Sequence, residues 1–282
     1  MIAFVGSVFS PYYHWRGRRD PDNHVAFNVA LYGPHGNVWT MTERGRRSLN
    51  RSVECLQIGA SSFQLERGSF VIMFDEMAMP WPGQRWLPKR VRGKIVLRPE
   101  AFTTEPHSLD YEGHHSWLPR APICQASVEC DVFPEGSWTG RGYHDINFGN
   151  RPIEQDFDGW DWARGDADSG TQILYDARLR DGRRRRIGLR ISAEGEVAPV
   201  DIPERQPMKA GFWGVRGGIA CDEDYQPIVV RALEDTPFYS RALVQTTVTG
   251  TRLTMMQETL DCNRLANPVV RLMLPFKMPR RA

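Results

Sequence analysis

His24-Val-Ala-Phe-Asn-Val-Ala-Leu-Tyr32 is the segment from which the fold class of this 282-residue chain can be inferred. From Val25 to Leu31 the larger apolar residues occupy every second position, so they share one face if the segment is a β-strand. The next residues, Gly33-Pro-His-Gly36, have the composition of a turn, and Val38 to Met41 resume the strand pattern. The segment therefore predicts a β-hairpin.

Strand patterns recur along the rest of the chain at intervals of roughly 10–20 residues, separated by Gly, Pro, Asn and Asp. Helical periodicity is scarce, although Glu258 to Leu265 is compatible with a short turn of helix. This pattern is typical of an all-β sandwich or barrel rather than of alternating strands and helices. The further strand candidates are Ser69 to Phe74, Lys89 to Leu97, Ile123 to Val132, Thr171 to Arg178, Arg186 to Ile191, Ile228 to Leu233 and Ser240 to Val248.

Two proline-containing segments are predicted to interrupt the strands. Trp81-Pro-Gly-Gln-Arg-Trp-Leu-Pro88 is predicted as a loop within the first half of the chain. Trp117-Leu-Pro-Arg-Ala-Pro122 is predicted to break any regular element, which places a domain junction near His115 to Pro122. The length of the chain allows one large domain or two moderate ones.

The composition narrows the class of partner. A net charge of +2 gives no global electrostatic reason to bind nucleic acid. Nine tryptophans suit a large apolar or π-rich ligand, although aromatic residues are more often ordinary core. Five cysteines without CxxC spacing argue against a disulfide framework and against structural zinc, and they fit a reducing cytoplasm.

No targeting or membrane-spanning segment is expected. Met1-Ile-Ala-Phe-Val5 lacks a basic region and a long apolar run, so we expect no signal peptide. No window approaches the roughly 20 apolar residues of a spanning helix. A substrate that resides in a membrane would have to be reached from the aqueous side.

Gly140-Arg-Gly-Tyr-His-Asp-Ile-Asn-Phe-Gly149 contains the strongest candidate for chemistry. On a strand Tyr143 and Asp145 point to the same face, with Trp138 shortly before them. Burial in such an aromatic pocket would raise the pKa of Asp145 and keep a usable proton on its carboxyl group near neutral pH. The alternative is a strand-end hydrogen-bonded pair that closes a turn.

An ordered series of motifs along the chain resembles the carotenoid 1,2-hydratase family, also called hydroxyneurosporene synthase. The resemblance extends from about Phe4 to Arg280, and its strength lies in the agreement of many motifs in order. Besides the Tyr143 segment, the motifs are Phe4-Val-Gly-Ser-Val-Phe-Ser-Pro-Tyr-Tyr13, Asp20-Pro-Asp-Asn-His24, Asn28-Val-Ala-Leu-Tyr-Gly33, Met41-Thr-Glu-Arg-Gly45, Trp160-Asp-Trp-Ala-Arg164, Leu174-Tyr-Asp176, Leu233-Glu-Asp-Thr-Pro-Phe-Tyr-Ser-Arg241 and Met273-Leu-Pro-Phe-Lys-Met-Pro-Arg280.

The resemblance implies two consecutive lipocalin-like β-barrel or sandwich units, with the ligand site between or within them. We therefore expect an N-terminal unit at residues 1–120 and a C-terminal unit at residues 121–282. The implied reaction is hydration of the terminal 1,2 double bond of an acyclic carotenoid such as neurosporene or lycopene. Protonation would give a tertiary carbocation, which water then attacks, and this chemistry needs no cofactor.

The family's Tyr-x-Asp and His-x-Trp elements fall on Tyr143/Asp145 and His115/Trp117. On this basis Asp145 is the expected acid, and Tyr143 would orient the acid or the water. Trp117 would stabilise the cation through its ring, a contact worth about 2 kcal/mol or more where water is excluded. His115 would position water or accept its proton. Without the family, a capping pair at a domain junction would be the preferred explanation for His115 and Trp117.

Other candidates for the substrate-binding pocket have structural alternatives. His24 follows a polar turn and is explained equally well by that turn. Trp160 and Trp162 share a strand face with Arg164, as in a packed core edge with an Arg–Asp pair. Tyr239 lies in a predicted hairpin turn, and Asp176, if buried, would need Arg178 or Arg190 as a partner.

Arg183-Arg-Arg-Arg186 follows the turn signal Asp181-Gly182 and is expected to be solvent-exposed. It would either protect a strand edge or contact anionic lipid, together with Lys277, Arg280 and Arg281 if the fold brings them close. The chain has no HxH or HExxH motif, so no catalytic metal is expected. The expected location is the cytoplasm, peripheral to the inner (photosynthetic) membrane.

Two alternatives to hydration remain at this stage. One is a polyene cyclase on the same scaffold, which would be favoured if Asp145 were buried in a salt bridge. The other is a carotenoid-binding protein without catalytic activity. The choice of carotenoid depends on pocket length and openness, which side-chain identities do not give.

Overall fold

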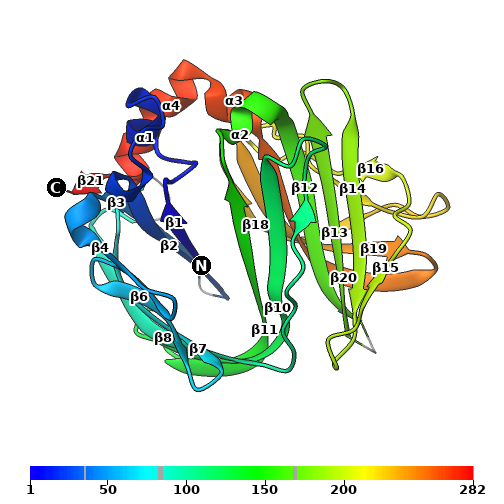
Figure 1. Ribbon diagram of the computed structural model, residues 1–282, viewed down its shortest axis with the longest axis horizontal. Coiled ribbons are helices and arrows are strands. Elements are labelled where there is room, and N and C mark those ends of the chain that lie inside the picture. The colour runs from blue at the N-terminus through cyan, green and yellow to red at the C-terminus, as the bar shows by residue number, and fades with distance from the viewer. Residues whose placement is uncertain (35, 82–84, 168–169, 282) are drawn as a thin grey trace. The chain divides into compact units, whose positions relative to one another are not determined.

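The computed structural model describes residues 1–34, 36–81, 85–167 and 170–281 (Figure 1). Most of the chain is β-strand, and the predicted all-β class is confirmed. Contacts divide the chain into two compact units. Unit 1 contains residues 1–99, 124–142 and 271–282, and unit 2 contains residues 100–123 and 143–270. These units differ from the expected consecutive segments 1–120 and 121–282, whose assignment as two lipocalin-like units stays a prediction.

Unit 1 contains the predicted hairpin. Its two strands pair from Val25 with Arg44 to Gly33 with Gly36, and the turn residue at position 35 lies outside the described residues. The hairpin belongs to a four-stranded sheet in the order β1-β2-β3-β21, in which β21 is parallel to β3. Its strands are β1 (Ile2–Val5), β2 (Val25–Gly33), β3 (Gly36–Arg44) and β21 (Arg280–Arg281).

A second group of unit 1 strands forms an antiparallel meander in the order β8-β7-β6-β5-β4, with the Cys124–Cys130 part of β10 paired to β8. These strands are β4 (Leu49–Arg51), β5 (Cys55–Ile58), β6 (Ser61–Glu66), β7 (Ser69–Ala78), β8 (Lys89–Pro99) and β10 (His115–Cys130). The helical elements are α1 (Pro11–Trp15), η1 (Pro21–Asn23), η2 (Arg46–Ser48) and α4 (Pro268–Lys277), of which residues 268–270 belong to unit 2.

Unit 2 is built on a seven-stranded antiparallel sheet in the order β15-β14-β13-β12-β20-β19-β18. Its strands are β12 (Phe157–Ala167), β13 (Gly170–Leu179), β14 (Arg184–Ile191), β15 (Val197–Pro199), β18 (Ile228–Asp235), β19 (Tyr239–Val248) and β20 (Thr251–Asp261). Further elements are β9 (His107–Ser108), β11 (Ser137–Gly149, in unit 2 from Tyr143), α2 (Ile153–Asp156), β16 (Arg205–Pro207), β17 (Gly218–Ala220) and α3 (Cys262–Ala266).

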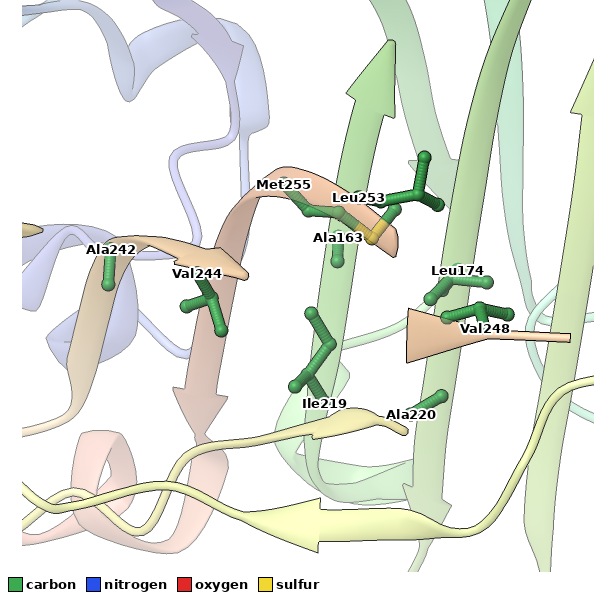
Figure 2. Close-up of a cluster of buried hydrophobic side chains, with 9 residues drawn as sticks. All are labelled: Ala163, Leu174, Ile219, Ala220, Ala242, Val244, Val248, Leu253 and Met255. Atoms are coloured by element: carbon green, nitrogen blue, oxygen red, sulfur yellow. The ribbon is translucent and has the colours of Figure 1, made fainter. Parts of the chain in front are cut away.

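Strand alternation gives this sheet two chemically different faces. One face packs against β17 through small and aliphatic side chains, as Figure 2 shows for Ile219 and Ala220 beside the strands. The opposite face carries Trp160, Trp162 and Arg164 of β12, as predicted from their spacing. The aliphatic cluster consists of Ala163, Leu174, Ile219, Ala220, Ala242, Val244, Val248, Leu253 and Met255.

One prediction about local structure is wrong, and another is right only in part. The segment from His115 to Pro122 does not interrupt the regular secondary structure, because strand β10 runs through it. Neighbouring residues donate to carbonyl groups there, with Thr103 N bonded to Arg120 O and Glu100 N to Ile123 O. These hydrogen bonds use carbonyl groups of the strand, and proline has a carbonyl group although it lacks the N–H. The helix expected from Glu258 starts only at Cys262, since β20 continues to Asp261.

The expectation for the arginine run is also wrong in part. The turn after β13 forms as predicted and Arg183 is exposed, but Arg184, Arg185 and Arg186 are half-buried. Arg184 pairs with Asp176 and Glu204, and Arg186 pairs with Glu204 at 2.9 Å. Arg185 Nε donates to the Ser108 carbonyl over 3.1 Å. This run therefore holds strand β14 to its neighbours.

Candidate active site

Trp117, Tyr143 and Asp145 form a hydrogen-bonded group within unit 2. Tyr143 and Asp145 lie two residues apart inside β11 and share a face as predicted, so the alternative of a strand-end pair is wrong. Trp117 Nε1 donates to Asp145 Oδ2 over 2.9 Å and to the Tyr143 hydroxyl over 3.2 Å. The Tyr143 hydroxyl donates to the same Asp145 oxygen over 3.1 Å. One oxygen of Asp145 therefore accepts from two aromatic side chains.

Aromatic rings surround this group. Trp162 and Tyr175 are cross-strand partners on β12 and β13, so their side chains lie side by side on one sheet face. The Trp162 ring centroid lies 5.5 Å from that of Tyr143, and the Tyr175 centroid lies 5.6 Å from that of Trp117. Trp117 itself is only 1% exposed. The acid thus has an apolar, π-rich environment.

This environment raises the pKa of Asp145 from 3.8 to about 6. Desolvation by burial is the largest cause, the hydrogen bonds from Trp117 and Tyr143 oppose it, and the charge of Glu258 adds to it. The pKa of Tyr143 is also raised, again mainly by desolvation. Both side chains keep part of their surface accessible, but protein atoms surround them densely enough for desolvation to dominate. Asp145 can therefore hold a proton near neutral pH.

The nearby cations are bound to other carboxylates. The Arg164 guanidinium lies 5.7 Å from the centre of the Tyr143 ring and pairs with Asp166 at 2.6 Å. Arg241 pairs with Glu258 at 2.7 Å and with Glu234 at 3.5 Å. Within the described part of the chain, Asp145 makes no ion pair. An arrangement of this kind favours a neutral acid over a fixed carboxylate.

His115 lies in a neighbouring polar network. Its Nε2 lies 2.7 Å from Asp156 Oδ2, and its backbone N–H donates to Asp110 Oδ2 over 2.7 Å. Arg151 Nε also donates to Asp156 over 2.7 Å. His115 is therefore fixed by two carboxylates, and its polar partners among the described residues do not include Asp145.

The comparisons with known proteins assign the family. The family model for the carotenoid hydratase CrtC matches residues 1–282. This chain belongs to the carotenoid hydratase family. The acyclic carotenoid 1,2-hydratase of Thiocapsa roseopersicina is 44% identical over 99% of the chain and 68% of the relative. That of Rhodobacter capsulatus is 40% identical over 100% of the chain and 98% of the relative.

A solved structure shares the fold. A protein of Nitrosomonas europaea, provisionally named AttH, superposes with a TM-score of 0.55 at 13% identity, over 84% of this chain and 80% of that one. The likeness supports the lipocalin-like architecture expected for this hydratase family member. The sheets of the present chain are open and sandwich-like and do not close into barrels.

The remaining pocket candidates of this family member are divided between the two units. Trp160 and Tyr239 belong to unit 2, and their strands β12 and β19 both pair with β20. His24 and Trp138 belong to unit 1. His24 Nδ1 lies 2.7 Å from Glu43 Oε1, and burial together with the charge of Arg280 lowers its pKa to about 4. The roles of all four in binding substrate stay predictions.

Two buried or partly buried aspartates have structural partners. Asp161 accepts from Arg205 Nε over 2.7 Å and from Thr259 Oγ1 over 2.6 Å, and also pairs with Arg178. Asp176 pairs with Arg184, so the expectation of Arg178 or Arg190 is wrong. The true partner lies across the β13–β14 hairpin, in a position that sequence separation alone does not identify.

The sequence analysis missed Glu258 and Arg241 as site residues. Glu258 is the cross-strand partner of Trp162 on one side and of Arg241 on the other. Apolar and polar residues alternate through Met255-Met-Gln-Glu-Thr-Leu260, which is the pattern of a β-strand with Glu258 on one face. The expectation of a helix from Glu258 obscured this pattern.

No metal-binding cluster accompanies these residues in the parts of the chain that are described. No group of three or more His, Cys, Asp or Glu side chains there is placed to hold a metal ion. A cavity of about 10 Å³ near Asp161 and Arg205 has room for about one water molecule. It is too small for a carotenoid.

Proposed function

We propose that this chain hydrates the terminal 1,2 double bond of acyclic carotenoids such as neurosporene and lycopene, giving 1-hydroxy carotenoids. Its family membership and its likeness to acyclic carotenoid 1,2-hydratases support this activity. The observation that carries the proposal is Asp145, a carboxyl group with a pKa of about 6, bonded to Tyr143 and Trp117 and free of ion pairs among the described residues. As an enzyme it would be a hydro-lyase.

In the proposed mechanism, Asp145 gives its proton to the less substituted alkene carbon, and the π electrons form the new C–H bond. The other carbon becomes a tertiary cation, which the rings of Trp117 and Tyr143 stabilise. Water attacks the cation and forms the C–O bond. The proton that this water releases passes to the Asp145 carboxylate or to His115, so the reaction consumes one water and no redox equivalent.

The site also bears on the alternatives. A cyclase on this scaffold was expected to hold Asp145 in a salt bridge, and the described arginines near Asp145 are paired elsewhere. A binding protein without activity has no need of a desolvated acid. Hydration is therefore the activity that this geometry supports best.

The proposed partners are the carotenoid, water and the lipid in which the carotenoid dissolves. Within the described residues, no helix is long and apolar enough to cross a membrane. We propose that the protein works from the cytoplasmic side, in peripheral contact with the inner membrane.

The test is incubation of purified protein with lycopene in water enriched in ¹⁸O. The expected product is a tertiary alcohol that carries solvent oxygen. Asp145→Asn should lower the rate of alcohol formation by orders of magnitude, while the folded variant still binds carotenoid. Oxygen derived from O₂, a cyclised product, or full activity of folded Asp145→Asn would each contradict the proposal.

A further inference from the structure

The C-terminal helix α4 presents an exposed apolar stripe. Leu272 and Phe276 are 63% and 76% exposed, and Val269 on the same helix is 66% exposed. Spacings of three and four residues place these side chains on one helix face. Arg271 and Leu274 on the other face are buried. The helix is therefore amphipathic, with its apolar stripe turned to solvent.

A loop of unit 1 adds two more exposed apolar residues. Trp86 is 87% and Leu87 is 77% exposed. They follow directly after Arg85, whose backbone exchanges two hydrogen bonds of 2.9 and 3.0 Å with the backbone of Trp81. The Lys277 ammonium at the end of α4 lies 5.0 Å from the centre of the Trp81 ring. The loop and the end of α4 are thus neighbours.

Leu272, Phe276, Trp86 and Leu87 define what we call the apolar surface. Single exposed apolar residues are common, but a group of large ones marks an interaction site. Transfer of these side chains from water to an apolar environment would be favourable. A binding partner with an apolar interior is therefore expected here.

Basic side chains lie around the apolar surface. Lys89 follows the loop and is exposed, as is Arg281 shortly after α4. Helix α1 lies beside α4 in Figure 1, with His14 in contact with Arg271, and exposed Arg16 follows α1. Aromatic and aliphatic residues next to Lys and Arg are typical of proteins that rest in the interface of an anionic bilayer.

We propose that the apolar surface docks this protein on an anionic lipid bilayer, with Lys89, Arg281 and Arg16 against the headgroups. The inference rests on the proposed function, since an acyclic carotenoid dissolves in the bilayer and must be taken from it. The run Arg183–Arg186 is less suited to this role, because three of its four arginines are half-buried and bound to other groups.

The experiment measures sedimentation of the protein with vesicles of phosphatidylglycerol and phosphatidylcholine, and with vesicles of phosphatidylcholine alone. Wild type should bind the anionic vesicles more tightly. Leu272→Ser/Phe276→Ser and Trp86→Ser/Leu87→Ser should each weaken binding at least tenfold. Lys89→Gln/Arg281→Gln should weaken binding to the anionic vesicles only. Phe212→Ser is the matched control, because Phe212 is 90% exposed and is not part of the apolar surface.

Hydration of lycopene in detergent separates this proposal from the proposed function. All these variants should hydrate detergent-dispersed lycopene at the wild-type rate, because none alters the candidate active site. Vesicle binding that is absent in wild type or unchanged in the variants would overturn the docking proposal. A wild-type dimer that the serine variants dissolve would also overturn it in favour of a second copy of this chain. Failure of wild type to act in detergent would count against the proposed function alone.

Discussion

The environment of Asp145 favours the protonated form of its carboxyl group and disfavours the charged form. Its pKa in the folded chain is raised to about 6, so the folded state binds this proton more tightly than the unfolded state does. The contribution to stability is therefore complete below the usual pKa of 3.8 and is lost as pH rises through about 6. At alkaline pH the folded protein carries a desolvated charge.

Asp145→Asn should for this reason stabilise the protein at pH 8, by about 2–3 kcal/mol, since each pKa unit between folded and unfolded chain corresponds to about 1.4 kcal/mol. At pH 4 the gain should be small, because the wild-type carboxyl group is then mostly protonated in the folded state. Urea unfolding at the two pH values measures the difference. An equal effect at both pH values would show that desolvation of the charge is not the cause.

Glu258 should set the pH range of activity through its effect on Asp145. The proposed mechanism needs protonated Asp145, so the rate should fall as pH rises through about 6. Glu258→Gln removes a negative charge that raises the Asp145 pKa, so this fall should move to lower pH. Glu234→Gln is the matched control, because Glu234 pairs with the same Arg241 at the longer distance of 3.5 Å. An unchanged pH profile in Glu258→Gln would exclude this electrostatic role.

Trp117 should shift the pH profile of activity in the direction opposite to that of Glu258. Its indole N–H bonds to the carboxylate and lowers the Asp145 pKa. Trp117→Phe keeps an aromatic ring for the cation but loses this donor, so the fall in rate should move to higher pH. Trp117→Ala also loses the ring and should be slower by a further tenfold or more, because each 1.4 kcal/mol of barrier is a factor of ten. Equal rates for the two variants, with equal loss of thermal stability, would indicate a packing role.

At the level of strands and helices, the sequence predicted what depends on local pattern. The β2–β3 hairpin and the shared face of Tyr143 and Asp145 follow from alternation with a period of two residues. The course of β10 through Pro119 and Pro122 did not, because it depends on which distant groups donate to its carbonyls. The pairing of His115 with Asp156 is likewise a tertiary contact, 41 residues apart, that no spacing rule encodes.

The strap formed by β16 and β17 is held on the sheet by Asp161. This carboxylate, 5% exposed, pairs with Arg205 of β16 and accepts the backbone N–H of Gly218 at the start of β17. Asp161→Ala should lower the free energy of unfolding by about 3 kcal/mol or more, since it leaves two partly buried arginines without their partner. Asp181→Ala, which breaks the solvent-exposed pair with Arg183, should lower the free energy of unfolding far less. Urea titrations compare the two, and similar losses would show that Asp161 does not anchor the strap.

For the whole molecule, the proposed chemistry places every chemical step on side chains and water. Protonation of an alkene by a carboxylic acid consumes no hydride, and attack by water on a tertiary cation needs no metal-bound hydroxide. The enzyme should therefore keep its lycopene hydration activity, within about twofold, after dialysis against a chelator and removal of nucleotides and flavins. Product formation by the treated protein, followed by chromatography, is the measurement. Loss of activity that is restored by a divalent ion, a nicotinamide or a flavin would place the reaction on a bound group, and Asp145 would then be a positioning residue rather than the acid.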